Sequence, residues 1–419
     1  MGSPADETVK DPKIHYAWIV MIAFGLVMSG TLGSLTVLAG LFVFPVTSDL
    51  GFDLSAFTMY LTATIVVLAL AMPLVGNLLT KVPLQVMLTI AGIIEFGVLG
   101  SMSFFTEIWQ WYIAGAISGV GLAATSVVTI TPTMGNWFRK RTGLAIGVVW
   151  AMQSLFDALA SPLIQLVIAD AGWRAGYQTL ACLSALLVLP CTVLIIRYRP
   201  EDKGMKPYGY DPSEVARVSS LEIPGVPYKV AVRSIPFFLC VALVMLCQLT
   251  SCMNQVFPTY AEVVGLGAAT GALMVSAASI CDIFLNPIAG TTGDAFGPTR
   301  AMLIWTGLAM LSFVILYLGS ASPVASCIGA GINDAMYAIC GVGYATFALS
   351  LFGMKDFERI FSRITSVGCL IASLGTPLMM LIFESTGDFR NVFVFCFAID
   401  AIIIALTLGA SKLGKALPR

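Results

Sequence analysis

The sequence predicts an all-α membrane protein with twelve transmembrane helices in two six-helix repeats. Three observations support this fold class: the composition, a series of long apolar runs, and the placement of Lys and Arg. Of the 419 residues, 58% are hydrophobic and only 11% are charged, and the mean hydropathy is +0.92. A soluble domain cannot bury that much apolar surface, and a disordered chain needs far more charge. The net charge of -1 excludes the basic surface expected of a nucleic-acid-binding protein.

Twelve apolar runs are long enough to cross a bilayer, which takes roughly 20 mostly apolar residues. Each run is continuous, whereas the strands of a membrane β-barrel alternate between apolar and polar residues. The runs predict helices over residues 16–46, 55–79, 83–105, 108–134, 142–168, 175–196, 234–262, 266–291, 301–320, 323–351, 360–384 and 390–411.

The placement of Lys and Arg predicts the topology. Of the 22 Lys and Arg, 20 lie in the tails or in loops on one side, and only Arg174 and Arg390 lie on the other. The positive-inside rule then places both termini in the cytoplasm. We expect the protein to lie in the inner (plasma) membrane of the cell. The polar N-terminus lacks the pattern of a signal peptide, so we expect the first run to remain as a helix.

Only one connection is long. The segment 197–233 is rich in Pro and charge and ends in a mildly amphipathic stretch, which predicts a cytoplasmic linker with a short interfacial helix. The predicted organisation is a cytoplasmic tail (1–15), a six-helix bundle (16–196), the linker (197–233), a second six-helix bundle (234–411) and a cytoplasmic tail (412–419).

Short motifs recur in the two halves at nearly constant spacing, which indicates two parallel repeats. The offsets are 213, 214 and 216 residues. The matching pairs are Phe44-Pro45 with Phe257-Pro258, Pro73 and Gly76 with Pro287 and Gly290, and Trp173-Arg174 with Phe389-Arg390.

The cysteines and the single histidine give no sign of metal or redox chemistry. All ten cysteines fall in apolar runs without a CxxC pair, and His15 precedes the first run. Small buried side chains are the favoured interpretation. Without a grouping of nucleophile, base and histidine, we expect no enzyme, no cofactor and no metal.

The loop GTTGDAFGPTR follows the eighth run, and its glycines allow close helix approach and a tight turn. It resembles the G-x-x-x-D-x-x-G-x-[RK] loop of the major facilitator superfamily. The resemblance implies a gating loop formed by Gly290, Asp294, Gly297 and Arg300. The matching loop of the first half has Thr80 where the acid is usual.

Further motifs narrow the resemblance. The stretches HYAWIV, NWFRKRTGLAIG, AGWRAGY and VAVRSIPFF look like the monocarboxylate transporter and oxalate–formate antiporter branch of that superfamily. The resemblance implies a twelve-helix bundle with a central cavity that opens alternately to each side. It places spans 1, 4, 7 and 10 around the cavity and spans 3, 6, 9 and 12 outside.

Five acids lie near the centres of apolar runs, where an ionised side chain costs ~2.5–3.5 kcal/mol. All Lys and Arg lie in loops or at span ends, so none is a deep partner. Because desolvation disfavours the charged form, these acids favour a proton or cation site over a fixed ion pair. They are Glu95, Asp157, Asp282, Asp334 and Asp400.

The resemblance ranks the five acids. Glu95 and Asp400 fall on outer spans, which favours a structural or interfacial role. Asp282, Asp334 and Asp157 are the predicted proton-coupling residues, with a neutral hydrogen-bonded helix contact as the alternative for Asp282.

The neighbours of Asp282 depart from the branch at one position. The branch carries an Asp followed four residues later by an Arg that clamps a carboxylate, and Asn286 replaces this Arg here. Because Asn is a weaker, neutral donor than the guanidinium fork, a dianion such as oxalate is disfavoured.

Other polar residues in the runs are predicted to orient a substrate, the alternative being hydrogen bonds between helices at ~0.6 kcal/mol each. The predicted substrate-binding residues are Asn286, Asn254, Gln255, Asn333, Tyr337 and Gln153.

We therefore expect a monomeric secondary transporter that couples protons to the symport of a small monocarboxylate. Its partners are the small-molecule substrate, protons and the lipid bilayer, with no nucleic acid. A carrier of a zwitterionic or cationic metabolite, an organic-anion antiporter, an exporter and a non-transporting receptor are the alternatives.

Overall fold

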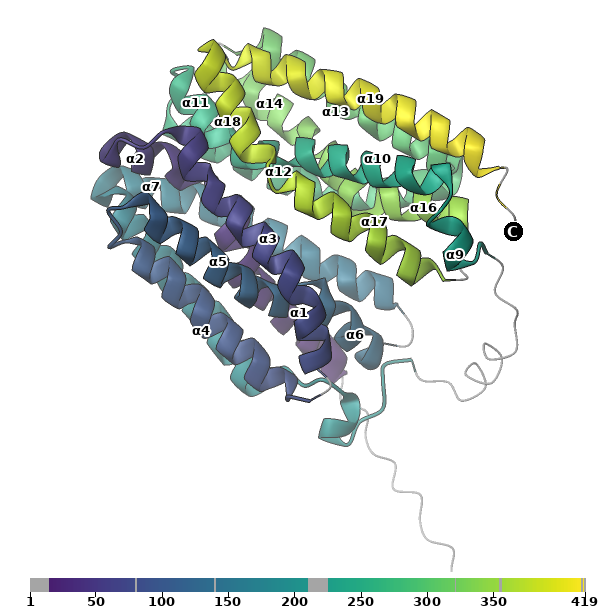
Figure 1. Ribbon diagram of the computed structural model, residues 1–419. Helices are drawn as coiled ribbons and strands as arrows, with labels where there is room; N and C mark the ends of the chain where they lie inside the picture. The colour runs from purple at the N-terminus through teal and green to yellow at the C-terminus, as the bar shows by residue number, and fades with distance from the viewer. Residues whose placement is uncertain are drawn as a thin grey trace, which may run out of the picture.

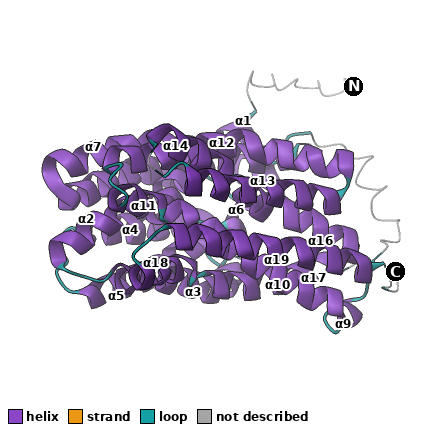
Figure 2. Ribbon diagram, turned by 90° about the horizontal axis from the view of Figure 1, so that it is seen from above, coloured by secondary structure: helices purple, strands orange, loops and turns teal. Residues whose placement is uncertain are grey.

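The computed structural model describes residues 15–79, 81–138, 141–209, 225–320, 322–353, 356–415 and 417. The predicted N-terminal tail up to residue 14, Thr80, residues 210–224 of the linker and part of the C-terminal tail are among the residues outside these ranges. The described chain is helical, with two isolated β-bridges and no strand (Figure 2). The predicted all-α fold class is confirmed.

Seven of the predicted crossings are continuous helices. The fifth and sixth share the label α7 but are two helices separated at Gly172, whose non-helical backbone with a φ of 81° suits glycine. The continuous helices are α3 (Leu54–Leu78), α4 (Leu84–Met102), α7 (Thr142–Pro190, containing two crossings), α12 (Ala268–Phe296), α13 (Pro298–Leu318) and α19 (Arg390–Gly414).

The other five crossings are interrupted part-way. The pieces are α1 (Tyr16–Met28), a π-helix (Ser29–Val37) and α2 (Gly40–Leu50) in the first; α5 (Ile108–Ala124) and α6 (Val127–Trp137) in the fourth; α10 (Ile235–Ser251), a 3₁₀ turn (Cys252–Gln255) and α11 (Phe257–Val263) in the seventh; α14 (Pro323–Asn333), α15 (Ala335–Ala338), a π-helix (Ile339–Gly343) and α16 (Tyr344–Phe352) in the tenth; and α17 (Phe357–Ala372) and α18 (Gly375–Thr386) in the eleventh.

The first, fourth, seventh and tenth crossings, which the resemblance places around a cavity, are all among the interrupted ones. Non-helical backbone at membrane depth is tolerated where protein or a water-filled cavity surrounds it. Asp334 is the single residue between α14 and α15, so an acid occupies one of these breaks.

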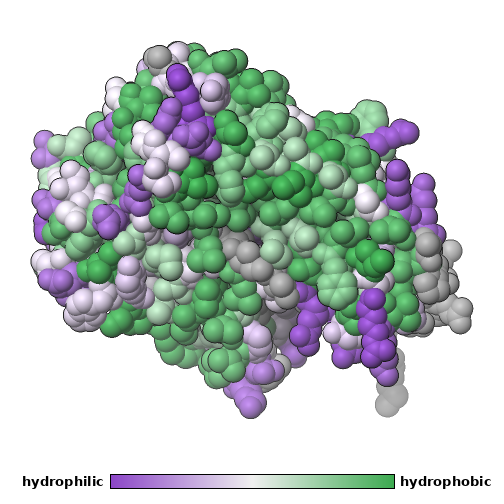
Figure 3. All heavy atoms as spheres, turned by 45° about the horizontal axis from the view of Figure 1, so that its top comes forward, coloured by the Kyte–Doolittle hydropathy of each residue, from purple (hydrophilic) through white to green (hydrophobic). Residues whose placement is uncertain are grey.

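Apolar side chains cover the flanks of the bundle. Nine helices of the described chain are long and apolar enough to cross a membrane. One of them, α7, contains two crossings, and the tenth and eleventh crossings bring the total to twelve. Leu74 and Leu318 are 70% and 77% exposed, as lipid-facing side chains would be. Figure 3 shows an apolar band with hydrophilic side chains gathered at its edges.

The buried cores follow the two halves of the chain (Figure 1). One core contains residues between Val226 and Ala410, and two smaller cores contain residues between Ala17 and Ile196 together with Ala272. The outer end of the bundle is defined here as the end that holds Arg174 and Arg390, and the inner end as the opposite one.

The halves meet in the outer part of the bundle, where α7 packs on α12, α3 on α18 and α2 on α11. Ser161 Oγ donates to the carbonyl of Ala272 at 2.9 Å, and Ser276 Oγ donates to the carbonyl of Ala158 at 2.7 Å. Thr62 Oγ1 likewise donates to the carbonyl of Ser373 at 2.6 Å. In Figure 1 the two sets of ribbons diverge toward the inner end. The described contacts thus close the outer end.

Backbone bonds attach the ends of the linker to one helix of each half. The N–H of Tyr208 donates to the carbonyl of Trp137 at the end of α6, and the N–H of Val226 donates to that of Phe352 at the end of α16, each at 2.8 Å. A one-turn helix, α9 (Tyr228–Ala231), precedes α10. Residues 210–224 of the predicted linker lie outside the described chain.

The predicted gating loop differs from the structure. The helix α12 continues to Phe296, so Gly290 and Asp294 lie within it, and Gly297 with a φ of 83° makes the turn into α13 alone. Thr291 and Thr292 bond back to the carbonyl of Ile288, which satisfies their hydroxyls inside a helix. Residues 290–296 are therefore helix rather than loop, and a gating role for this segment stays a prediction.

Candidate functional site

Three buried acids gather where the two halves meet at mid-depth. Asp157 comes from α7 in the first half, Asp282 from α12 in the second, and Asp334 from the break between α14 and α15. Their exposed fractions are 2%, 8% and 2%. These are the three residues that the sequence predicts for proton coupling, and electrostatic interactions connect Asp282 with each of the other two.

Asp282 forms the centre of the hydrogen-bond network. Its Oδ2 accepts from Ser154 Oγ of α7, and its Oδ1 accepts from Asn286 Nδ2 one turn further along α12, each at 2.5 Å. Asp334 lies close to Asp282, and the two carboxyl groups interact electrostatically. Two ionised carboxylates repel each other at short range, so a proton on one of them relieves the repulsion.

Asp157 is held from its own helix and lies against the first crossing. Its Oδ2 accepts from Gln153 Nε2 at 3.2 Å, whereas its Oδ1 is buried and has no partner in the described chain. That oxygen points at Gly33, where an added Cβ would collide with it. The missing side chain of Gly33 is therefore what lets the carboxylate approach the π-helix of the first crossing.

No positive side chain neutralises this cluster within the described residues. The one ion pair recorded there joins Arg174 and Asp49 at the outer end. Separate ionised carboxylates buried together would repel each other and lose their hydration. The arrangement can therefore hold protons, or it can bind a cation among the acids.

Four of the predicted substrate-binding residues border the three acids. Asn286 and Gln153 donate to Asp282 and Asp157 as described above. Asn254 lies beside Asp334, and its Oδ1 is buried without a partner in the described chain. Tyr337, one turn beyond Asp334, interacts electrostatically with all three acids.

Two other predicted substrate-binding residues bond to neighbouring helices. Asn333 Nδ2 donates to Ser312 Oγ of α13 at 2.9 Å, and Gln255 Oε1 accepts from Thr376 Oγ1 of α18 at 2.6 Å. The alternative named above, a hydrogen bond between helices, describes both side chains in this structure.

The remaining two buried acids lie apart from the cluster. Glu95 on α4 lies against Gly121 of α5, where an added Cβ would collide with its Oε1. Asp400 on α19 interacts electrostatically with Cys247 and Cys396. Both acids are fully buried, and none of their carboxylate oxygens has a partner in the described chain.

Sequence reasoning missed Ser154 and Gly33. Ser154 precedes Asp157 by three residues on α7 and so shares a helix face with it, which was an available signal. No local pattern distinguishes Gly33 from the other glycines of the first crossing. Of the predicted gating residues, the side chain of Asp294 is outside the described part, and Arg300 is exposed at the inner end.

Solved structures share this architecture. A D-xylose–proton symporter matches with a TM-score of 0.71 at 13% identity, over 96% of this chain and 98% of that one. A bacterial homologue of the human lysosomal transporter Spinster matches with a TM-score of 0.72 at 13% identity, over 96% and 99%. At this level of identity the likeness shows the fold alone.

Curated relatives come from one branch. Monocarboxylate transporter 4 of Rattus norvegicus is 25% identical over 300 residues, which cover 70% of this chain and 61% of the relative. Monocarboxylate transporter 13 of Bos taurus is 26% identical over 73% of this chain and 69% of the relative. The model of the Major Facilitator Superfamily matches residues 17–280. With twelve crossings in the same architecture, the chain belongs to the major facilitator superfamily.

Proposed function

We propose that this protein is a secondary transporter that carries a small monocarboxylate together with protons by alternating access. The observation that carries the proposal is the cluster of Asp157, Asp282 and Asp334, which lies between the two halves without a positive partner in the described chain. The relatives named monocarboxylate transporters support the substrate class.

Protonation of the acid cluster could be coupled to movement of one half of the protein relative to the other. Asp282 interacts electrostatically with Asp334, so the two carboxylates cannot both ionise cheaply, and Asp282 also accepts from Ser154 of the opposite half. Gaining or losing a proton at Asp282 therefore changes a contact between the halves. A ligand shifts such an equilibrium only by its different affinity for the two arrangements, and a proton on this carboxyl has that property.

Neutral groups would receive the substrate. Asn286, Asn254 and Tyr337 border the acids and offer amide and hydroxyl donors to a carboxylate. Because these donors are weaker than the guanidinium of the branch, the substrate enters with its own proton, which keeps total charge in the site low. In this proposal the protein lies in the plasma membrane with both termini in the cytoplasm, as the Lys and Arg placement predicts.

Uptake into proteoliposomes tests the proposal. With an inward proton gradient, lactate, acetate, formate, oxalate and betaine are offered separately, and a protonophore is added in a parallel series. We expect a monocarboxylate to accumulate and the protonophore to abolish its accumulation. Accumulation that persists without the gradient would contradict proton coupling.

The same measurement separates a second candidate, a carrier of zwitterionic or cationic metabolites. The absence of a cation beside the three acids in the described chain favours it, because a substrate ammonium group could supply the missing charge. Uptake of betaine without uptake of any monocarboxylate would establish this second function and exclude the first.

A further inference from the structure

The two arginines of the outer end, Arg174 and Arg390, occupy equivalent positions in the two repeats. In the first half, Arg174 Nη1 pairs with Asp49 Oδ2 at 3.1 Å and its guanidinium lies 4.1 Å from the centre of the Trp173 ring. The indole Nε1 of Trp173 donates to the same oxygen of Asp49 at 2.9 Å. One carboxylate thus binds two donors from the aromatic–Arg motif.

In the second half the equivalent carboxylate does not pair with the arginine. Glu262 stands at the position of Asp49, but Phe389 replaces the indole and so cannot donate to it. Glu262 instead interacts with the backbone N–H of Ala268. No ion pair joins Arg390 to an acid in the described residues. The guanidinium of Arg390 lies 5.6 Å from the centre of the Tyr317 ring and has no carboxylate acceptor in the described residues.

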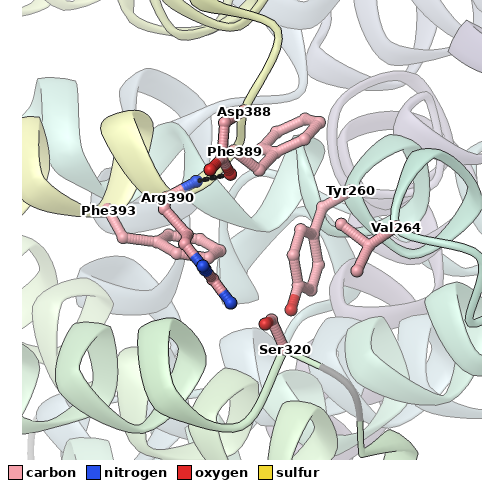
Figure 4. A pocket seen from close by; sticks show the side chains of 7 residues that line it. All are labelled: Tyr260, Val264, Ser320, Asp388, Phe389, Arg390 and Phe393. Atoms are coloured by element: carbon pink, nitrogen blue, oxygen red, sulfur yellow. Dashed lines mark hydrogen bonds between the residues drawn. The ribbon is translucent and has the colours of Figure 1, made fainter.

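A cavity of about 140 Å³ lies beside Arg390. In Figure 4 the guanidinium points toward the hydroxyl of Tyr260 and the side chain of Ser320. The rings of Phe389 and Phe393 also line the space. Cationic and hydroxyl donors thus converge on a cavity with apolar walls, a combination that suits a carboxylate with a short apolar tail.

One acid also lines the cavity but is engaged elsewhere. Asp388 Oδ1 accepts from the backbone N–H of Arg390 at 2.9 Å, at the start of α19. Figure 4 shows this bond on the side away from the guanidinium. The carboxylate of Asp388 therefore caps the helix and leaves the guanidinium facing Tyr260 and Ser320.

We infer that this cavity binds a small carboxylate at the outer end of the protein, with Arg390 as its counter-charge. The ligand carboxylate takes the place that Asp49 holds in the first half, accepting from the guanidinium in two parallel bonds and from the hydroxyls of Tyr260 and Ser320. The site is separate from the three central acids and does not depend on the proposed transport.

The rate of chemical modification of Arg390 tests whether this cavity is occupied. The purified protein in phosphatidylcholine nanodiscs is treated with phenylglyoxal. Mass spectrometry measures the modification rates of Arg390 and Arg174. The reaction is run with sodium acetate and, separately, with sodium chloride at equal ionic strength. We expect acetate to slow the reaction of Arg390 at least threefold relative to chloride and to leave that of Arg174 unchanged. Equal protection of both arginines, or of neither, would overturn the inference.

Two variants sharpen the test. Ser320→Asp places a carboxylate in the cavity, so Arg390 should react slowly without acetate and gain no protection from it. Asp49→Asn is the matched control: it frees Arg174, whose reaction should accelerate while acetate still fails to protect it. If phosphatidylglycerol in the nanodiscs protects Arg390 and acetate adds nothing, the occupant is a lipid headgroup and the assignment to a soluble carboxylate fails.

Discussion

Ser154 on α7 donates its hydroxyl hydrogen bond to Asp282 on α12 and thereby joins the two halves at the edge of the acid cluster. This bond lies nearer the inner end than the bond from Ser161 to Ala272, which also joins α7 and α12. It is also the one whose acceptor changes charge when it takes up a proton at mid-depth. The bond between Ser154 and Asp282 therefore depends both on the protonation of Asp282 and on the relative position of the two halves.

Replacing Ser154 should alter the pH dependence of uptake. Ser154→Ala removes a donor that favours the ionised form of Asp282, so the pH of half-maximal uptake should move upward. A hydrogen bond to a charged group contributes ~1.5–3 kcal/mol, which corresponds to about one to two pH units. The measurement is initial uptake into proteoliposomes across a series of external pH values.

Ser161→Ala is the matched control for that experiment. It removes a hydrogen bond between the same two helices, but the acceptor is the carbonyl of Ala272, which does not titrate. Its uptake rate should change while the pH profile keeps its midpoint. Identical shifts in both variants would mean that Ser154 acts only as a structural contact.

Asp282→Asn should abolish accumulation driven by a proton gradient, because an amide cannot take up the proton. Exchange of labelled for unlabelled substrate across the membrane should persist, since exchange needs no net proton movement. Asp400→Asn, on the outer helix α19, is expected to keep the coupling. Intact gradient-driven uptake by the Asp282 variant would remove this residue from the coupling mechanism.

Asn286→Arg tests the substrate class directly. The change places a guanidinium beside Asp282 and should lower the KM for a monocarboxylate about tenfold, since a charge-assisted bond contributes ~1.5–3 kcal/mol. The same change should abolish uptake of a cationic substrate by repulsion. Asn286→Gln controls for side-chain size without adding charge, and a lower KM in both variants would contradict an effect of charge.

Gly33→Ala should destabilise the protein by ~1–3 kcal/mol, because the added Cβ would collide with the carboxylate of Asp157. Gly97→Ala on α4 is the control: nothing lies within 4 Å of a Cβ added there. That variant should be neutral or more stable, since alanine is the better helix former. Thermal unfolding in detergent measures both, and equal stability of the two variants would refute the close approach.

The ion pair between Asp49 and Arg174 predicts a pH-dependent contribution to stability at the outer end. Bonds from Trp173 and Arg174 hold the pKa of Asp49, an exposed residue at the outer end of α2, below its ordinary value of 3.8. Because the folded-state pKa is depressed, the stabilisation is present above the ordinary value and is lost as the pH falls through the folded-state value. Asp49→Asn should lower the apparent Tm slightly at pH 7, and the difference should shrink as the pH falls below 3.8; a constant difference would contradict the ion pair.

Much of the acid cluster could be predicted from the sequence. Acids in apolar runs are rare enough to stand out, and the resemblance separated Asp157, Asp282 and Asp334 from Glu95 and Asp400. The orientation of amide side chains could not be predicted in the same way. Asn333 and Tyr337 are four residues apart, which would place them on one face of a continuous helix. The helix is interrupted at Asp334, between the two residues, and Asn333 bonds to Ser312 instead.

The sequence by itself determined the twelve crossings, because a helix in a bilayer must satisfy its backbone within one continuous apolar segment, which is a local requirement. Only the tertiary structure decided which side chains meet. Ser154 contacts Asp282 across 128 positions of the chain, and Gly33 makes room for Asp157. These contacts depend on how each helix is rotated and interrupted when the halves pack together, and that follows from the shapes of neighbours distant in sequence.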